Sequence, residues 1–243
     1  MEEQRQVKET PQLLETSLRD FAKQLEDLED CPDLRKAQKE CPDIANDESF
    51  HLMFLRTELF DVKLAAERYV KYWENRVTLW GDKAFQELTL DDDATAISYG
   101  FIGSVKGQDR VIYMRPGVIP KDRDIHSACR VAIFTTLQAL RNSTEMQQKG
   151  ALVLMDFHGV TGYDKEFYDT YHRLAGDGFP LRVSLVGLVR PLPLMGIVVD
   201  IIKLMLKPKI RNRVKVIRND DKLAKHSGVE SIKSLLGRIQ GPL

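Results

Sequence analysis

The sequence predicts an α/β fold in which an all-helical N-terminal lobe is followed by a mostly parallel sheet covered by helices. Up to about residue 90, apolar residues recur every three or four positions, which is typical of amphipathic helices. Beyond Asp91, short β-branched or apolar runs alternate with helix-length segments, and this alternation favours a parallel sheet. With 243 residues and 43% hydrophobic residues, the chain can build one large domain or two small ones.

The N-terminal lobe is expected to contain three helical blocks. The apolar stripe of the first block consists of Leu13, Leu14, Leu18, Phe21, Leu25 and Leu28. Pro32 and Pro42 predict a short polar link after it. A second block runs from about Glu48 to Phe60, and a third begins near Asp61, which is a suitable N-cap.

The second half of the chain contains the predicted strands and the helices between them. The expected strands are residues 97–104, 110–115, 151–156, 183–189 and 213–217. The expected helices are residues 124–148, 164–176 and 194–207.

The helix-length run from Leu194 to Leu206 is unusually apolar, because Asp200 and Lys203 are its only charged residues. A helix that packs on one side of a core needs an apolar arc of roughly 100°, and this run has far more. It is nevertheless too short to span a bilayer, which takes about 20 apolar residues. Two prolines, Pro191 and Pro193, precede the run. Its excess apolar surface must contact something other than water.

The formal net charge of zero hides a strong polarity along the chain. Residues 1–49 contain 14 acidic and 7 basic residues, whereas residues 203–238 contain 11 basic and 3 acidic residues. Such an asymmetry suits an anionic partner, because the local field steers association. The alternative is that the two ends of the chain neutralise one another in the fold.

Signatures of enzymes, metal sites and cofactor sites are absent from the sequence. It contains no G-x-S-x-G, G-x-x-x-x-G-K-[ST] or H-E-x-x-H motif, and its three cysteines lack the spacing of a zinc site. The most enzyme-like position is Asp156, which ends a predicted strand and is followed closely by His158. We expect Asp156 to bind backbone N–H groups of the following turn rather than to act as an acid or base. The N-terminus lacks the apolar core of a secretory signal, so we expect a soluble protein of a reducing compartment.

Several segments, in order, resemble a known family. Residues 50–62 (FHLMFLRTELFDV), 107–117 (GQDRVIYMRPG), 144–160 (TEMQQKGALVLMDFHGV), 179–183 (FPLRV) and 206–214 (LKPKIRNRV) are similar to blocks of the CRAL-TRIO family of Sec14-like lipid-binding proteins. The strand that begins FPLRV is most similar to the branch that carries tocopherol and retinaldehyde. The resemblance covers about Asp47 to Asn219.

This resemblance implies a domain organisation and a mode of action. Residues 1–90 would form the helical N-terminal lobe, with the family's N-terminal element from about residue 47. Residues 91–218 would form the CRAL-TRIO α/β/α lipid-binding domain, and residues 219–243 a C-terminal tail that is either divergent or shortened. In this family a mobile gate helix closes a deep apolar pocket, and the 194–206 helix is the segment that fits this gate.

The resemblance also implies two sets of site residues. The residues expected to line the pocket are Val153, Met155, Leu174, Leu181, Val183, Val186, Ile202 and Leu206. The residues expected to bind phosphoinositide headgroups are Arg182, Lys209 and Arg213, while a fourth basic position of the family falls on Ser184. Two departures, Leu181 in place of a glutamate and Glu58-Leu59 in place of a basic pair, argue against phosphatidylinositol inside the pocket.

The predicted function is therefore a non-enzymatic lipid carrier that needs no cofactor or metal. Its partners would be a tocopherol-, retinoid- or phospholipid-like molecule and an anionic, phosphoinositide-containing membrane, and not nucleic acid. Such a protein would be cytoplasmic and transiently membrane-associated. Two alternatives stay open: an adaptor module that binds a membrane or a protein without cargo, and a lipid-modifying hydrolase built around Asp156 and His158.

Overall fold

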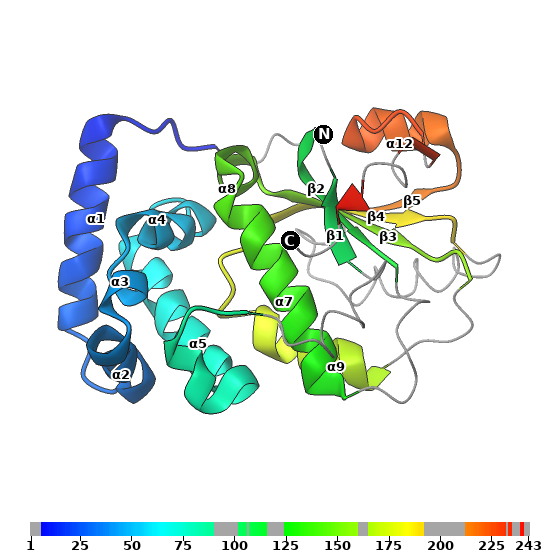
Figure 1. Cartoon of the computed structure of the whole chain (residues 1–243). Coiled ribbons are helices and arrows are strands. Elements are labelled where there is room, and N and C mark those ends of the chain that lie inside the picture. Colours follow the sequence, from blue (N-terminus) through cyan, green and yellow to red (C-terminus); the bar gives the residue numbers. More distant parts are fainter. Residues whose placement is uncertain are drawn as a thin grey trace.

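The computed structural model describes residues 6–89, 102–105, 107–115, 124–159, 165–191, 212–231, 233–234 and 239–240. It contains a helical N-terminal lobe and a sheet with helices on both faces (Figure 1). This arrangement confirms the predicted α/β fold.

The N-terminal lobe is a set of helices whose starts are encoded locally. Its helices are α1 (Pro11–Glu26), α2 (Pro32–Glu40), α3 (Pro42–Ala45), α4 (Glu48–Thr57) and α5 (Val62–Trp80), followed by the 3-10 helix η1 (Gly81–Phe85). The side chains of Thr10, Asp47 and Asp61 accept hydrogen bonds from the first turns of α1, α4 and α5.

The polar link predicted around Pro32 and Pro42 is wrong, because each proline begins a helix instead. Proline suits the first helical position, where its missing N–H would have had no partner in the helix. Cys31 and Cys41 precede these prolines and are buried. The two Cys-Pro-Asp tripeptides are therefore helix starts.

The sheet has the strand order β5-β4-β3-β2-β1-β6. Its strands are β1 (Ile102–Val105), β2 (Gln108–Met114), β3 (Ala151–Asp156), β4 (Val183–Val189), β5 (Val214–Ile217) and β6 (Ile239–Gln240). The strands β2, β3, β4 and β5 are parallel, whereas β1 runs antiparallel to both of its neighbours. The prediction of a mostly parallel sheet is thus confirmed.

Helices cover the two faces of the sheet unequally. The helices α7 (Ile125–Arg141), α8 (Thr144–Lys149) and α9 (Lys165–Ala175) lie on the side of the N-terminal lobe, and α12 (Asp220–Ser227) packs on the other side (Figure 1). The single helix predicted for residues 124–148 is two helices, because Ser143 caps α8 through its hydroxyl. The predicted 194–207 helix and the first part of the predicted 97–104 strand lie outside the described residues.

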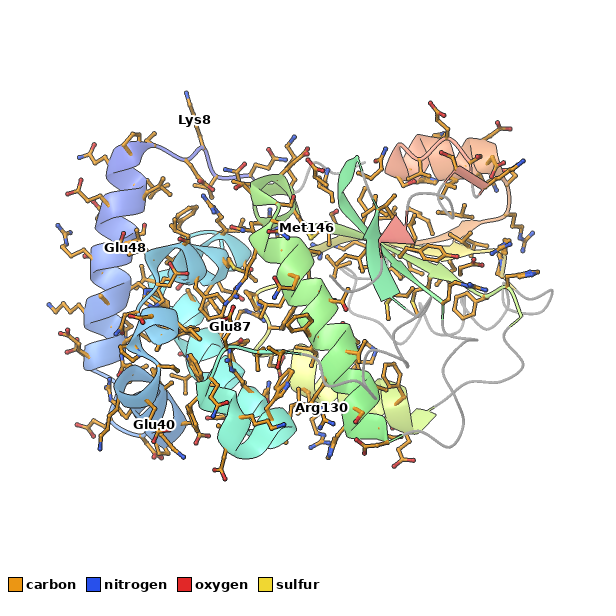
Figure 2. The ribbon with its side chains drawn as sticks, viewed as in Figure 1. Lys8, Glu40, Glu48, Glu87, Arg130 and Met146 are labelled. Atoms are coloured by element: carbon orange, nitrogen blue, oxygen red, sulfur yellow. The ribbon has the colours of Figure 1, made fainter. Side chains whose placement is uncertain are left out.

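One hydrophobic core continues from the N-terminal lobe into the sheet. It joins Phe54 and Trp73 of the lobe to Cys129 of α7, Ala151 of β3 and Phe167 of α9. Side chains fill the space between the two parts along this boundary (Figure 2). The lobe is therefore packed against the sheet domain and not tethered beside it.

Candidate functional site

Three parallel strands present an apolar surface that is only partly covered. In one row across the strands, Val153 pairs with Val186, and Val186 pairs with Val214. Two residues further along each strand, Met155 pairs with Leu188, and Leu188 pairs with Val216. Paired residues in parallel strands share a face. Leu188 is buried, and the other five keep part of their surface exposed. We call these six residues the apolar grid.

The opposite face of the same strands is sealed. Leu154, Val189 and Ile217 have 0% exposure and pack with Leu223 of α12. Gly187 also lies on this face, where a Cβ atom would come within 2.7 Å of Ile217 and Leu154. The sheet thus has one closed face and one face whose apolar residues remain accessible at β3, β4 and β5.

The structure brings together only part of the predicted pocket lining. Val153, Met155 and Val186 belong to the apolar grid, and the partly buried Leu181 packs near it in the core that contains Leu174. Val183 stands apart, because the pairing of β3 with β4 shifts by one residue there. Ile202 and Leu206 lie outside the described residues.

Sequence reasoning missed three members of the apolar grid, Leu188, Val214 and Val216. The signal that could have found them is the alternation of side chains along a strand. Once Val186 is assigned to the exposed face of β4, Leu188 follows two residues later. Val214 and Val216 follow the same alternation in β5, but only the structure shows which residues of β4 they pair with.

Asp156 is a buried anchor at the carboxyl end of β3. Its side chain accepts hydrogen bonds from Nε and Nη2 of Arg190, from the hydroxyl of Tyr113 and from the backbone N–H of His158. The last bond confirms the expectation that Asp156 binds the following turn. Burial by itself would raise the pKa of Asp156, but the hydrogen bonds from Arg190 and Tyr113 lower it. Because both oxygens are held by donors that favour the ionised form, the geometry suits anchoring and not proton transfer.

Three arginines gather at the opposite edge of the sheet, where the parallel strands begin. Arg182 immediately precedes β4, Arg213 immediately precedes β5, and Arg110 lies near the start of β2. The guanidinium groups bind backbone carbonyls there: Arg182 that of Gln148, and Arg213 that of Val183. We call this group the arginine edge. The predicted headgroup residues Arg182 and Arg213 thus lie near one another, whereas Lys209 lies outside the described residues.

The N-terminal segment before α1 is latched to the junction of the two lobes. Arg56 of α4 donates to both carboxylate oxygens of Glu9, at 2.9 and 2.8 Å, and to the side-chain oxygen of Gln147 in α8 at 2.6 Å. Burial opposes ionisation of Glu9, yet the hydrogen bond and charge of Arg56 lower its pKa. These contacts tie residues 6–10 to α4 and α8.

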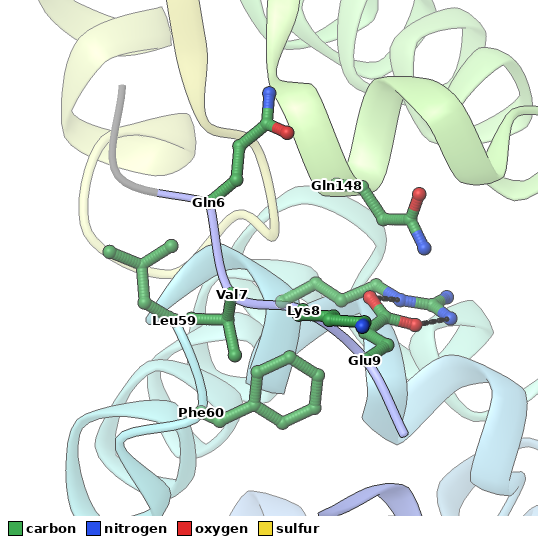
Figure 3. Close-up of a pocket in the computed structure, with 8 residues that line it drawn as sticks. Gln6, Val7, Lys8, Glu9, Leu59, Phe60 and Gln148 are labelled. Carbon is green, nitrogen blue, oxygen red and sulfur yellow. Dashed lines mark hydrogen bonds and ion pairs between the residues drawn. The ribbon is translucent and has the colours of Figure 1, made fainter. Parts of the chain in front are cut away.

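A cavity of about 260 Å³ lies beside this latch (Figure 3). Its lining consists of Gln6, Val7, Lys8, Glu9, Arg56, Leu59, Phe60 and Gln148. Most of these side chains are polar or charged, and that of Lys8 extends away from the body of the molecule (Figure 2). A lipid tail would find little apolar surface here, so the apolar grid is the better candidate for a hydrophobic ligand.

The helix α1 of the acidic first segment and the helix α12 of the basic last segment lie far apart. Figure 1 shows α1 at one end of the molecule and α12 at the other. These two helices therefore do not neutralise one another by contact.

Comparison with known proteins places the chain in a family. Residues 98–237, more than half of the chain, match the CRAL/TRIO domain. The chain belongs to the CRAL/TRIO family, as the resemblance predicts. No helix in the described ranges is long and apolar enough to cross a membrane.

Among its relatives are alpha-tocopherol transfer protein-like proteins of three mammals. Those of Pongo abelii and Homo sapiens are 31% identical to it over 188 residues, and that of Mus musculus is 30% identical. The match covers 72% of this chain and 54% of each relative, so the chain spans about half the length of these proteins.

The crystal structure of Sfh5 has the same fold. It aligns with a TM-score of 0.59 over 96% of this chain and 93% of that chain, at 12% sequence identity. At this level of identity the likeness concerns the fold alone.

Proposed function

We propose that this protein binds and transfers a hydrophobic lipid, which it holds against the apolar grid. The observation that carries the proposal is the contrast between the two faces of the sheet: one is sealed by α12, and the other keeps apolar side chains accessible. The names of the mammalian relatives, which are alpha-tocopherol transfer protein-like, support the same class of ligand.

Binding would derive from removing apolar surface from water. Each Å² of apolar surface buried contributes roughly 25 cal/mol before the costs of ordering the ligand. In this proposal the 194–206 helix is the gate that covers the ligand, and Ile202 and Leu206 complete the lining begun by Val153, Met155 and Val186. The pocket would take a tocopherol-, retinoid- or phospholipid-like molecule.

Release would occur at an anionic membrane that contains phosphoinositides. Arg182, Lys209 and Arg213 would bind the headgroups, at about 1 kcal/mol for each basic residue near the surface. The position of Arg182 and Arg213 at one sheet edge supports this role, since their charges act on the same region of space. Exchange rather than chemistry is the proposed activity, because Asp156 is held as an anchor.

The direct test is to purify the protein, extract it with organic solvent and identify lipids by mass spectrometry. We expect a stoichiometric hydrophobic ligand in the wild-type protein and its loss in Val186→Asp, which puts a charge in the middle of the apolar grid. Leu64→Asp in α5 is the matched control, because Leu64 is 47% exposed and distant from the grid in sequence. A folded protein that contains and takes up no α-tocopherol, retinal, sterol or phospholipid would refute the carrier function and favour an adaptor.

The membrane step has a separate test. Lys209→Glu combined with Arg213→Glu should weaken sedimentation with vesicles that contain phosphatidylinositol 4-phosphate, without changing ligand content. Unchanged binding to those vesicles would contradict the headgroup role.

A further inference from the structure

Arg110 is a basic residue of the arginine edge that its position in the sequence does not reveal. From β2 its guanidinium group reaches across the start of β3: Nε donates to the carbonyl of Gly150, and Nη2 donates to the carbonyl of Lys149 and to Oγ of Ser184, all at 3.0 Å. Ser184 in turn donates to the carbonyls of Gly150 and Ala151. The hydroxyl of Ser184 therefore helps to orient Arg110 toward β4.

The three guanidinium groups are not balanced by acidic partners. Within the described ranges, no carboxylate forms an ion pair with Arg110, Arg182 or Arg213. Glu145 acts on Arg110 through space, but its carboxylate binds Lys149. Burial first, and then the charges of Arg213 and Arg110, lower the pKa of Arg182. Three like charges thus lie within reach of one another in partly buried positions.

Arg182 also has unused hydrogen-bonding capacity. Its Nη2 binds the carbonyl of Gln148, but Nε and Nη1 are buried and have no hydrogen-bond partner. A buried donor without a partner is costly, and more so when it is charged. An anion that accepted hydrogen bonds from these two atoms would satisfy Arg182 and relieve the repulsion among the three arginines.

We propose that Arg110 completes the headgroup site of Arg182 and Arg213, in which it supplies the positive charge that Ser184 lacks. A phosphomonoester carries about −1.5 to −2 charges at pH 7 and three acceptor oxygens. A phosphodiester has one charge and two such oxygens, so it balances three arginines less well. Guanidinium groups suit this task because their planar forks bind phosphate oxygens in pairs.

This inference rests on the proposed membrane step and specifies its chemistry. The experiment compares phosphatidylcholine vesicles that contain phosphatidylinositol 4-phosphate, a phosphomonoester, with vesicles that contain phosphatidylinositol, a phosphodiester, at matched surface charge. Arg110→Gln should weaken binding to the first by about fivefold, the effect of one basic residue near an anionic surface, and alter binding to the second much less. Arg19→Gln is the control, because Arg19 lies exposed on α1.

A rescue variant separates binding from a purely structural role. Ser184→Arg returns a base to position 184, so Arg110→Gln/Ser184→Arg should recover most of the lost affinity. If Arg110 only held the turn between α8 and β3, this second substitution would not restore binding. Arg110→Lys keeps the charge without the fork and should fall between wild type and Arg110→Gln. Circular dichroism of each variant confirms that it is folded.

The outcomes distinguish this inference from the proposed membrane step. Weak binding by Arg182→Gln and Arg213→Gln but normal binding by Arg110→Gln would overturn the role of Arg110 and leave the membrane step intact. Equal losses on both kinds of vesicle would overturn the role of Arg110 in a phosphate site, because its charge would then act on any anionic surface. If no variant weakened binding, both would fall. Titration with soluble inositol 1,4,5-trisphosphate tests whether the phosphate comes from a lipid headgroup or from a free ligand. If the protein bound this ligand through Arg110 but did not bind vesicles, the anion site would be supported and the membrane cue overturned.

Discussion

Arg190 has an unusual backbone for its residue type. Its φ is +47°, a left-handed conformation that asparagine tolerates better than arginine. In this chain the arginine accepts that conformation, and its side chain neutralises Asp156, which has 0% exposure. A favourable buried ion pair thus accompanies a less favourable backbone.

Arg190→Asn is expected to destabilise the protein by about 3 kcal/mol, because breaking a buried ion pair leaves an uncompensated charge. Asp156→Asn/Arg190→Asn should be more stable than Arg190→Asn alone, since it removes that charge. Urea unfolding of the three proteins measures this difference. If Arg190→Asn were as stable as wild type, the ion pair would stabilise the protein no more than asparagine does by adopting this backbone conformation more easily.

The same pair predicts an acid dependence. Because the pKa of Asp156 is lowered in the folded protein, its contribution is present above the unfolded pKa of about 3.9 and is lost as the pH falls through the folded pKa. Arg190→Asn should therefore show a smaller loss of unfolding free energy than wild type between about pH 4 and pH 2. An equal loss in both proteins would assign the acid dependence to other carboxylates.

His51 predicts pH dependence in a different window. It is buried beside Phe21 and Tyr69, and its Nε2 lies 2.9 Å from the carbonyl oxygen of Ala45. Burial lowers the pKa of His51, so stability is lost as the pH falls below the unfolded value of about 6.5. Wild type should lose unfolding free energy between pH 7.5 and 5.5, and His51→Gln should lose less. His172 is exposed, so His172→Gln should behave as wild type. An equal loss of unfolding free energy in wild type, His51→Gln and His172→Gln would contradict the role of His51.

At the scale of the elements, the turn between α8 and β3 depends on one glycine. Gly150 has a φ of +81°, and a Cβ atom there would lie 2.8 Å from the carbonyl oxygen of Arg182. Gly107 is a matched position, because its φ is +74° but a Cβ atom would meet nothing within 4 Å. Both glycines have a positive φ, and they differ in the space around them.

Gly150→Ala should therefore destabilise the protein more than Gly107→Ala, by about 3 against about 1 kcal/mol. The carbonyl of Gly150 also binds Arg110, so only Gly150→Ala should disturb the arginine edge and weaken vesicle binding. Thermal unfolding and vesicle sedimentation measure the two effects. Similar destabilisation at both positions would show that glycine is required at position 150 by its backbone conformation and not by the contact with Arg182.

Local patterns were sufficient to predict most elements but not the contacts between them. The strands at 151–156 and 183–189 and the cap at Asp61 follow from alternation and capping, and the structure confirms them. The sequence alone does not distinguish a polar link from a helix start at Pro32 and Pro42, because proline is common both just after a helix and at the first position of one. Arg110 was missed because its partner Ser184 is 74 residues away, and no local pattern records such a pairing.

At the scale of the whole molecule, the two lobes share more than a common core. Asn75 of α5 donates to the carbonyl of Leu174 at 2.8 Å, and Arg68 donates to the carbonyl of Phe179 at 3.0 Å just before β4. Arg68 is itself held by Glu58 at 2.5 Å. These bonds fix the N-terminal lobe against the segment that leads into the apolar grid and the arginine edge.

Such a continuous interface predicts that the lobe and the sheet unfold as one cooperative unit. Both tryptophans, Trp73 and Trp80, lie in α5, so tryptophan fluorescence reports on the lobe, while hydrogen exchange at β3 and β4 reports on the sheet. In urea the two transitions should coincide, as a two-state system requires. Arg56→Met, which cuts the latch to Glu9 and Gln147, should lower both midpoints together by the equivalent of about 3 kcal/mol. A fluorescence transition at clearly lower urea than the sheet transition would show instead that the lobe unfolds on its own.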